Sequence, residues 1–98
     1  MAKKHFLLKL IPPRPTFAQD MTTEERKIMM EHTVYLRGYM EQGVALVYGP
    51  VLDPKGAYGL GIVEVDDIEQ VKELVRNDPA AKINTYEIYP MMAVTPEK

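Results

Sequence analysis

The sequence contains two side chains of the kind that transfer protons, His32 and Asp78. Helical spacing predicts that both face the interior. His32 belongs to a set of residues spaced as one face of a helix with about 3.6 residues per turn. A histidine on such a face must place its imidazole against the rest of the fold and find partners for its ring nitrogens. The members of this face are Ile28, His32, Tyr35, Leu36, Tyr39 and Met40.

Asp78 extends the inner face of a second predicted helix, four residues after Leu74 and seven after Val71. The helix dipole disfavours a carboxylate at a helix C-terminus, and a nearby imidazolium would offset this cost. If His32 and Asp78 meet, the carboxylate fixes the tautomer of the imidazole, as in general acid–base catalysis. Two alternatives stay open. His32 could be a core histidine bonded to a backbone carbonyl, and Asp78-Pro79 could simply end a helix.

The elements that must position these residues are delimited by prolines, glycines and helix caps. Thr22 and Glu25 form a capping box, and Gly43 is a typical residue after a helix end. The first strand is apolar on both faces, which predicts a central strand. The second helix is expected to bury Ile68, Val71, Leu74 and Val75. The predicted strands are 5–11, 44–48, 59–65 and 83–91; the helices lie between Thr22 and Gly43 and between Asp66 or Asp67 and Pro79; Pro12–Met21 is an irregular loop and Thr95–Lys98 a flexible tail.

This order, β-α-β-β-α-β, predicts an α+β fold of the ferredoxin-like class, a four-stranded antiparallel sheet with two helices on one face. Apolar residues occupy both registers of the strands, for example Leu7 beside Phe6 and Leu8. The face away from the helices would therefore expose a large apolar patch unless something covers it. A second copy of the chain is the simplest cover, so we expect a homodimer joined through the open sheet face, a dimeric α+β barrel.

Composition narrows the function classes for this chain of 98 residues, which is long enough for one domain, residues 1–98. The absence of cysteine excludes a disulfide scaffold and a catalytic thiol, and with only two histidines we expect no metal and no cofactor. A net charge of −2 without a basic stripe argues against nucleic acid as a partner. No apolar run approaches the roughly 20 residues that cross a membrane, and the start of the chain does not read as a signal peptide. We expect a cytoplasmic protein with no membrane partner.

Five short motifs, in order, resemble the YCII-related (YciI-like) family of small bacterial proteins. They are EHTVYLR (31–37), EQG (41–43), YGP (48–50), GIVEV (61–65) and NDP (77–79), and the likeness covers roughly Phe6 to Pro90. The family is similar in fold to muconolactone isomerase and other dimeric α+β barrel proteins. The resemblance also implies a cleft lined by a histidine and an aspartate proposed as an acid–base pair, which match His32 and Asp78.

The chain departs from the family pattern at two places. Ala80 stands directly after Asp-Pro, where members often have an aromatic residue, so one wall of the cleft is expected to be more open. The loop Pro12–Met21 is longer than the shortest members need, and Arg14 or Phe17 could line or cover the cleft. The alternative is a solvent-facing loop without a ligand role.

Four further residues are predicted to contact a small-molecule ligand. One hydroxyl among Tyr35, Tyr48, Tyr86 and Tyr89 could reach the cleft, and Tyr35 and Tyr48 are the two assigned to it, although tyrosines are also common packing residues. Gly49 and Pro50 shape the end of a strand and let the backbone lie close to the His32 ring without a side chain between them.

Three readings of the function follow. The first is an enzyme of isomerase, lyase or hydrolase type that transfers a proton on a small organic molecule, with His32 as acid or base and Asp78 as its orienting partner. The alternative is a non-catalytic ligand-binding or accessory dimer, in which the same pair only braces the helices. That alternative is favoured by the lack of an evident nucleophile or oxyanion clamp. Haem binding through His32 is a third reading, based on fold analogy alone.

Overall fold

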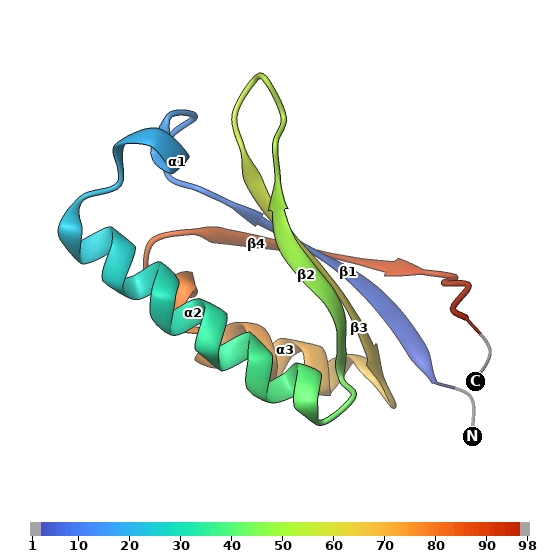
Figure 1. The fold of residues 1–98 in the computed structure, drawn as a ribbon. Coiled ribbons are helices and arrows are strands. Elements are labelled where there is room, and N and C mark those ends of the chain that lie inside the picture. The colour runs from blue at the N-terminus through green and yellow to red at the C-terminus, as the bar shows by residue number, and fades with distance from the viewer. Residues whose placement is uncertain (1–2, 97–98) are drawn as a thin grey trace.

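Four strands and two long helices account for most of residues 3–96, the part of the chain that the computed structural model describes (Figure 1). The elements follow the predicted order, with one short helix and one 3-10 turn added. They are β1 (Lys4–Ile11), α1 (Phe17–Asp20), α2 (Thr23–Glu41), β2 (Ala45–Val51), β3 (Tyr58–Val65), α3 (Ile68–Asn77), the 3-10 turn η1 (Pro79–Lys82) and β4 (Thr85–Met91).

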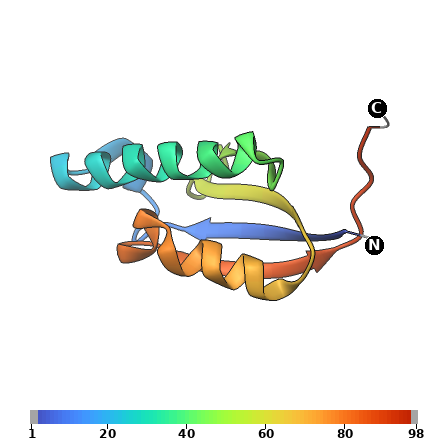
Figure 2. The same cartoon turned by 90° about the horizontal axis from the view of Figure 1, so that it is seen from below.

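The strands form one antiparallel sheet in the order β2-β3-β1-β4, which is the ferredoxin-like topology. The apolar first strand, β1, is indeed central and pairs with β3 and β4. Its residues Phe6, Leu8 and Leu10 are buried. Both long helices lie below the sheet in Figure 1 and run side by side when seen from below in Figure 2. The predicted α+β class is confirmed.

Helix α2 begins and ends where its capping signals predicted. The amide of Glu25 donates to the Thr22 hydroxyl at 3.1 Å, and the amide of Thr22 donates to the Glu25 carboxylate at 2.9 Å. Gly43, just beyond the helix, has a φ of 81°, a conformation that glycine adopts without strain. Leu36 is buried and His32 is partly buried on the face directed at the sheet. The caps therefore fix which face of α2 meets the core.

Helix α3 begins after the second of the two predicted caps, Asp67, whose carboxylate accepts the amide hydrogen of Glu69. Val71 and Leu74 are among the most deeply buried side chains of the core. Ile68 differs from the prediction, because 39% of it is exposed. It is the first residue of the helix, only three residues after β3 ends.

Two strands differ from the prediction by more than one residue at an end. The strand expected to end at residue 48 continues as β2 to Val51, and Pro50 lies opposite Gly59 in the register. β2 is an edge strand, so the missing amide hydrogen of Pro50 leaves no neighbouring strand unpaired. β4 starts two residues later than predicted, because Ile83 donates its amide hydrogen to Ala80 in the turn after α3.

The segment Pro12–Met21 contains one helical turn, α1, where the sequence predicted only irregular structure. Phe17 on this turn is buried. The loop between β2 and β3 contacts the same segment: a Cβ atom at Gly56, whose φ is 145°, would lie 3.3 Å from Pro15. This contact joins the upper end of the hairpin to the segment before α1.

The end of the described chain is irregular at Thr95 and Pro96, and the last two residues of the predicted tail Thr95–Lys98 lie outside the described residues. Within residues 3–96, no helix has the length and apolar character needed to cross a bilayer.

Candidate functional site

His32 and Asp78, which stand 46 positions apart, are in direct contact. The Nδ1 atom of His32 lies 2.8 Å from one carboxylate oxygen of Asp78 and 3.0 Å from the other. The Asp78 side chain is wholly buried, whereas 13% of the His32 side chain is exposed. The imidazole therefore stands between a buried carboxylate and an accessible space.

Asp78 is held in place by backbone and side-chain donors on two elements. It ends α3 and starts η1, where its Oδ1 accepts the amide hydrogen of Ala80 at 2.9 Å. The hydroxyl of Tyr86, on β4, donates to its Oδ2. Asp78 thus accepts from two donors besides its contact with His32, a setting that favours the ionised carboxylate.

The hydroxyl of Tyr86 keeps its proton and therefore donates to Asp78. Its burial, followed by its hydrogen bond to Asp78, raises the pKa of the Tyr86 hydroxyl well above its usual range. The sequence named Tyr86 as one of four tyrosines whose hydroxyl could reach the cleft, but did not assign it to the site. Its signal was its position in β4, where it lies opposite Leu10 of β1 on the helix-facing side of the sheet.

The contacts of Asp78 fix the tautomer of His32. An ionised Asp78 can only accept, so Nδ1 carries a hydrogen, and in the neutral imidazole Nε2 then carries the lone pair. Among the described residues, every buried side-chain nitrogen or oxygen has a hydrogen-bond partner. Nε2 makes no hydrogen bond within residues 3–96, so it is not buried, and it is the reactive atom left accessible at the cavity that His32 lines.

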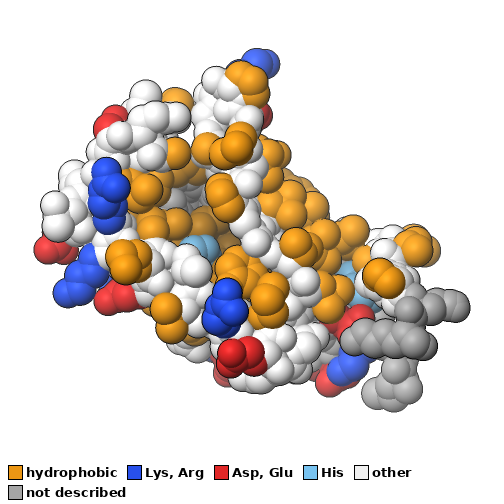
Figure 3. All heavy atoms as spheres, in the orientation of Figure 1, with side chains coloured by type: hydrophobic (Ala, Val, Ile, Leu, Met, Phe, Trp, Pro, Cys, Tyr) orange, Lys and Arg blue, Asp and Glu red, His pale blue; other side chains and the backbone are white. Residues whose placement is uncertain are grey.

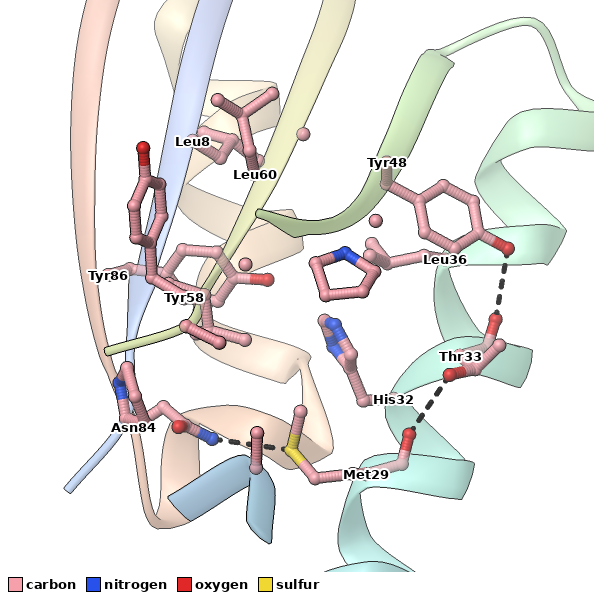
Figure 4. A pocket seen from close by; sticks show the side chains of 18 of the residues that line it. Leu8, Met29, His32, Thr33, Leu36, Tyr48, Tyr58, Leu60, Asn84 and Tyr86 are labelled. Atoms are coloured by element: carbon pink, nitrogen blue, oxygen red, sulfur yellow. Dashed lines mark hydrogen bonds between the residues drawn. The ribbon is translucent and has the colours of Figure 1, made fainter. Parts of the chain in front are cut away.

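The accessible space is a cavity of about 380 Å³ between α2 and the β2–β3 hairpin, with α1 at one end. Figure 3 shows the hollow, with apolar side chains around it and a histidine at its floor. In the close view of Figure 4, His32 rises from α2 into a space bordered by Leu36, Tyr48 and Met29. The described residues that line the cavity include no lysine, arginine, aspartate or glutamate.

The structure brings together most of the residues predicted to bind a ligand. Phe17 of α1 and Tyr48, Gly49 and Pro50 of β2 line the cavity with His32. The Tyr48 hydroxyl lies 3.4 Å from the carbonyl oxygen of Thr33, so the ring lies across the side of α2 (Figure 4). The unexpected extension of β2 through Pro50 supplies this wall.

Arg14 lies outside the cavity lining and has a structural contact instead. Its guanidinium donates to both oxygens of Glu25, at 2.8 and 3.0 Å, and to Asp20 at 2.8 Å. These bonds lower the pKa of Glu25 to about 2, chiefly through the hydrogen bond from Arg14. The guanidinium also stands 5.3 Å from the centre of the Phe17 ring. Arg14 therefore fastens α1 to the start of α2 and holds Phe17 in the cavity wall.

Tyr35 also lies outside the lining, and it links the two long helices. Its hydroxyl donates to the carbonyl oxygen of Leu74 at 2.7 Å, and burial raises the pKa of the Tyr35 hydroxyl above its usual range. Its ring packs edge-on against Tyr39, with 5.3 Å between ring centres. Since Leu74 precedes Asp78 by one helical turn, this bond keeps the end of α3 beside His32.

A ferredoxin-like fold with a histidine and a buried aspartate beside an apolar cavity defines a small α+β protein with a candidate proton-transfer site. The model of the YCII-related domain family matches residues 6–95, and the chain belongs to this family. No curated protein is similar enough to the chain to count as a relative.

Proposed function

We propose that this YCII-related protein is an acid–base catalyst that moves a proton on a small organic molecule, with Nε2 of His32 as the base. The observation that carries the proposal is the position of the imidazole, which has Asp78 on one side and the cavity on the other. A base must lie within hydrogen-bond reach of the proton that it takes, and Nε2 meets whatever enters the cavity.

Asp78 orients the imidazole and stabilises the imidazolium that forms when Nε2 takes a proton. In the step, a C–H or O–H bond of the substrate breaks, its electron pair stays on the substrate, and an N–H bond forms at Nε2. Returning that proton to another atom of the substrate completes an isomerisation, and returning it to a leaving group completes a lyase reaction. Hydrolysis would use the same base on a water molecule.

We also propose that the protein works as a homodimer joined through the open face of the sheet, in the cytoplasm. On that face Leu7 of β1 lies opposite Ile62 of β3 and Tyr89 of β4. Tyr89 is 49% exposed. An apolar band across three strands favours a second copy of the same face as its cover.

Proton removal can be tested by hydrogen–deuterium exchange in D₂O, followed by NMR on enolisable ketones. The panel is 2-tetralone, 2-indanone and phenylpyruvate. We expect the wild-type protein to accelerate exchange of at least one ketone, and His32→Ala to remove about 10²–10⁴-fold of that acceleration. His5→Ala is the matched control, because His5 lies on the other face of the sheet and pairs with Glu64.

Exchange that is no faster with the wild type than with His32→Ala, for every ketone, would contradict catalysis. The non-catalytic alternative would then gain support, since the His32–Asp78 contact and the Tyr35–Leu74 bond both link α2 to the end of α3. In that case the pair braces the helices beside a ligand pocket.

A further inference from the structure

The cavity presents a hydrogen-bond acceptor to its occupant. In the neutral imidazole, Nε2 of His32 carries the lone pair when Nδ1 donates to Asp78. A ligand that meets Nε2 must therefore supply a hydrogen. A carboxylate cannot, and its oxygens would face another acceptor.

The charges around the cavity also disfavour an anionic ligand. With a neutral imidazole, the charged group in contact with the ring is the Asp78 carboxylate, which is buried directly behind it. The cavity lining within residues 3–96 has no basic side chain to balance a second negative charge. Arg14, the nearest arginine in sequence to the lining residue Phe17, is engaged by two carboxylates. An anion could enter only together with a proton for His32.

The walls select a small apolar shape. They include Phe17, Met29, Leu36, Pro50 and Val63, and the volume of about 380 Å³ lies near the lower end of small-molecule sites. Three polar lining groups are already engaged: the Thr33 hydroxyl donates to the carbonyl oxygen of Met29, the Asn84 amide to that of Ala80, and the Tyr86 hydroxyl to Asp78. One ring with short substituents, in contact with these walls and with Nε2, matches the cavity.

We propose that the cavity takes an uncharged, largely apolar ring compound with one weakly acidic O–H group, of the phenol or enol class. This inference rests on the proposed function. The O–H group donates to Nε2 of His32. When the proton moves, the O–H bond breaks, its electron pair stays on oxygen, and an N–H bond forms at Nε2. The new oxyanion faces the imidazolium, and the total charge of ligand, His32 and Asp78 does not change.

Three probes of matched shape test the class by calorimetry or by NMR titration of the wild-type protein. They are 4-methylphenol, 4-methylbenzoate and 1,4-dimethylbenzene. We expect 4-methylphenol to bind about tenfold or more tightly than 4-methylbenzoate. It should bind several-fold more tightly than 1,4-dimethylbenzene, because the latter cannot donate to Nε2. Tighter binding of the benzoate, or no binding of the phenol, would overturn the proposal.

Two variants connect the preference to the cavity. In His32→Ala the advantage of the phenol over 1,4-dimethylbenzene should disappear, whereas His5→Ala should retain it. Thr33→Lys places a cation at the exposed rim of the lining and should shift the preference toward 4-methylbenzoate by tenfold or more. An unchanged preference in Thr33→Lys would contradict the charge argument, even if His32→Ala did not fold.

The ligand class and the proposed catalysis can be refuted independently, the first by the binding data and the second by the ketone exchange data. Preference for the phenol without His32-dependent exchange would retain the ligand class and remove catalysis. His32-dependent exchange with tighter binding of the benzoate would retain the base and overturn the ligand class.

Discussion

Tyr86 of the sheet donates a hydrogen bond to Asp78, the partner of His32. Loss of the Tyr86 hydroxyl should therefore weaken the function of His32. Tyr86→Phe deletes the hydroxyl that donates to Oδ2 while keeping the ring that packs beside the cavity. We expect ketone exchange to fall several-fold and the free energy of unfolding to fall by about 1.5–3 kcal/mol, the range for hydrogen bonds to charged groups. Urea unfolding and exchange rates measure the two effects. Tyr89→Phe, in which an exposed hydroxyl bonded to Glu87 is lost, should change neither by a comparable amount.

The stability of the protein at alkaline pH gives a second test of the contact between Tyr86 and Asp78. Because the pKa of Tyr86 is raised in the folded protein, the neutral hydroxyl favours folding. This contribution is complete below the ordinary tyrosine pKa of about 10 and is lost as the pH rises above it. Unfolding measured at a series of alkaline pH values should show a steeper loss of stability for the wild type than for Tyr86→Phe. Equal slopes would contradict the assigned contact.

At this scale, the sequence could place His32 and Asp78 on the inner faces of their helices, because a helical period depends only on nearby residues. It could not select Tyr86 from several tyrosines. Strand alternation gives the face on which Tyr86 lies, but its meeting with Asp78 depends on where the turn after α3 crosses β4. The contact of Arg14 with Glu25 could not be predicted for a similar reason, since it spans the helical turn α1, which the loop prediction did not include.

At the scale of elements, the contact of Arg14 with Glu25 should make the attachment of α1 depend on pH. The pKa of Glu25 is lowered to about 2 in the folded protein from 4.5, so its ion pair stabilises the fold above about pH 4.5. That contribution declines as the pH falls toward 2. We expect Arg14→Met to unfold more easily than the wild type at pH 6 and to approach it at pH 2–3. Denaturant unfolding at both pH values measures the difference.

Arg37→Met is the matched control, because Arg37 is an exposed arginine on α2 away from α1. It should not reproduce the pH dependence. A stability difference between Arg14→Met and the wild type that is the same at pH 6 and pH 2–3 would contradict the ion-pair contribution.

The starts of both long helices could be predicted from their capping residues, Thr22 and Asp67. A cap is a hydrogen bond between residues close in sequence, so it can be recognised without knowledge of the fold. The length of β2 could not be predicted in the same way. Pro50 was expected to end the strand, and it is tolerated only because β2 lies at the sheet edge. Whether a strand lies at the edge is a property of the whole sheet. The part of β2 that continues through Pro50 supplies one wall of the cavity.

At the scale of the whole molecule, the open face of the sheet should hold two copies together. Leu7→Glu puts a charge in the middle of the apolar band formed with Ile62 and Tyr89. Light scattering after size-exclusion chromatography should give twice 11.2 kDa for the wild type and 11.2 kDa for the variant. Val34→Glu, on an exposed position of α2, should remain a dimer. A monomeric wild type would contradict the dimer proposal.

The tautomer of His32 is the most direct test of the proposed base. Long-range proton–nitrogen NMR spectra distinguish an imidazole that carries its hydrogen on Nδ1 from one that carries it on Nε2. At a pH where the ring is neutral, we predict the Nδ1–H form in the wild type. Asp78→Asn, whose amide group can donate to Nδ1, should shift it toward the Nε2–H form. An Nε2–H imidazole in the wild type, or the same spectrum in both proteins, would mean that Asp78 does not leave Nε2 free to accept a proton.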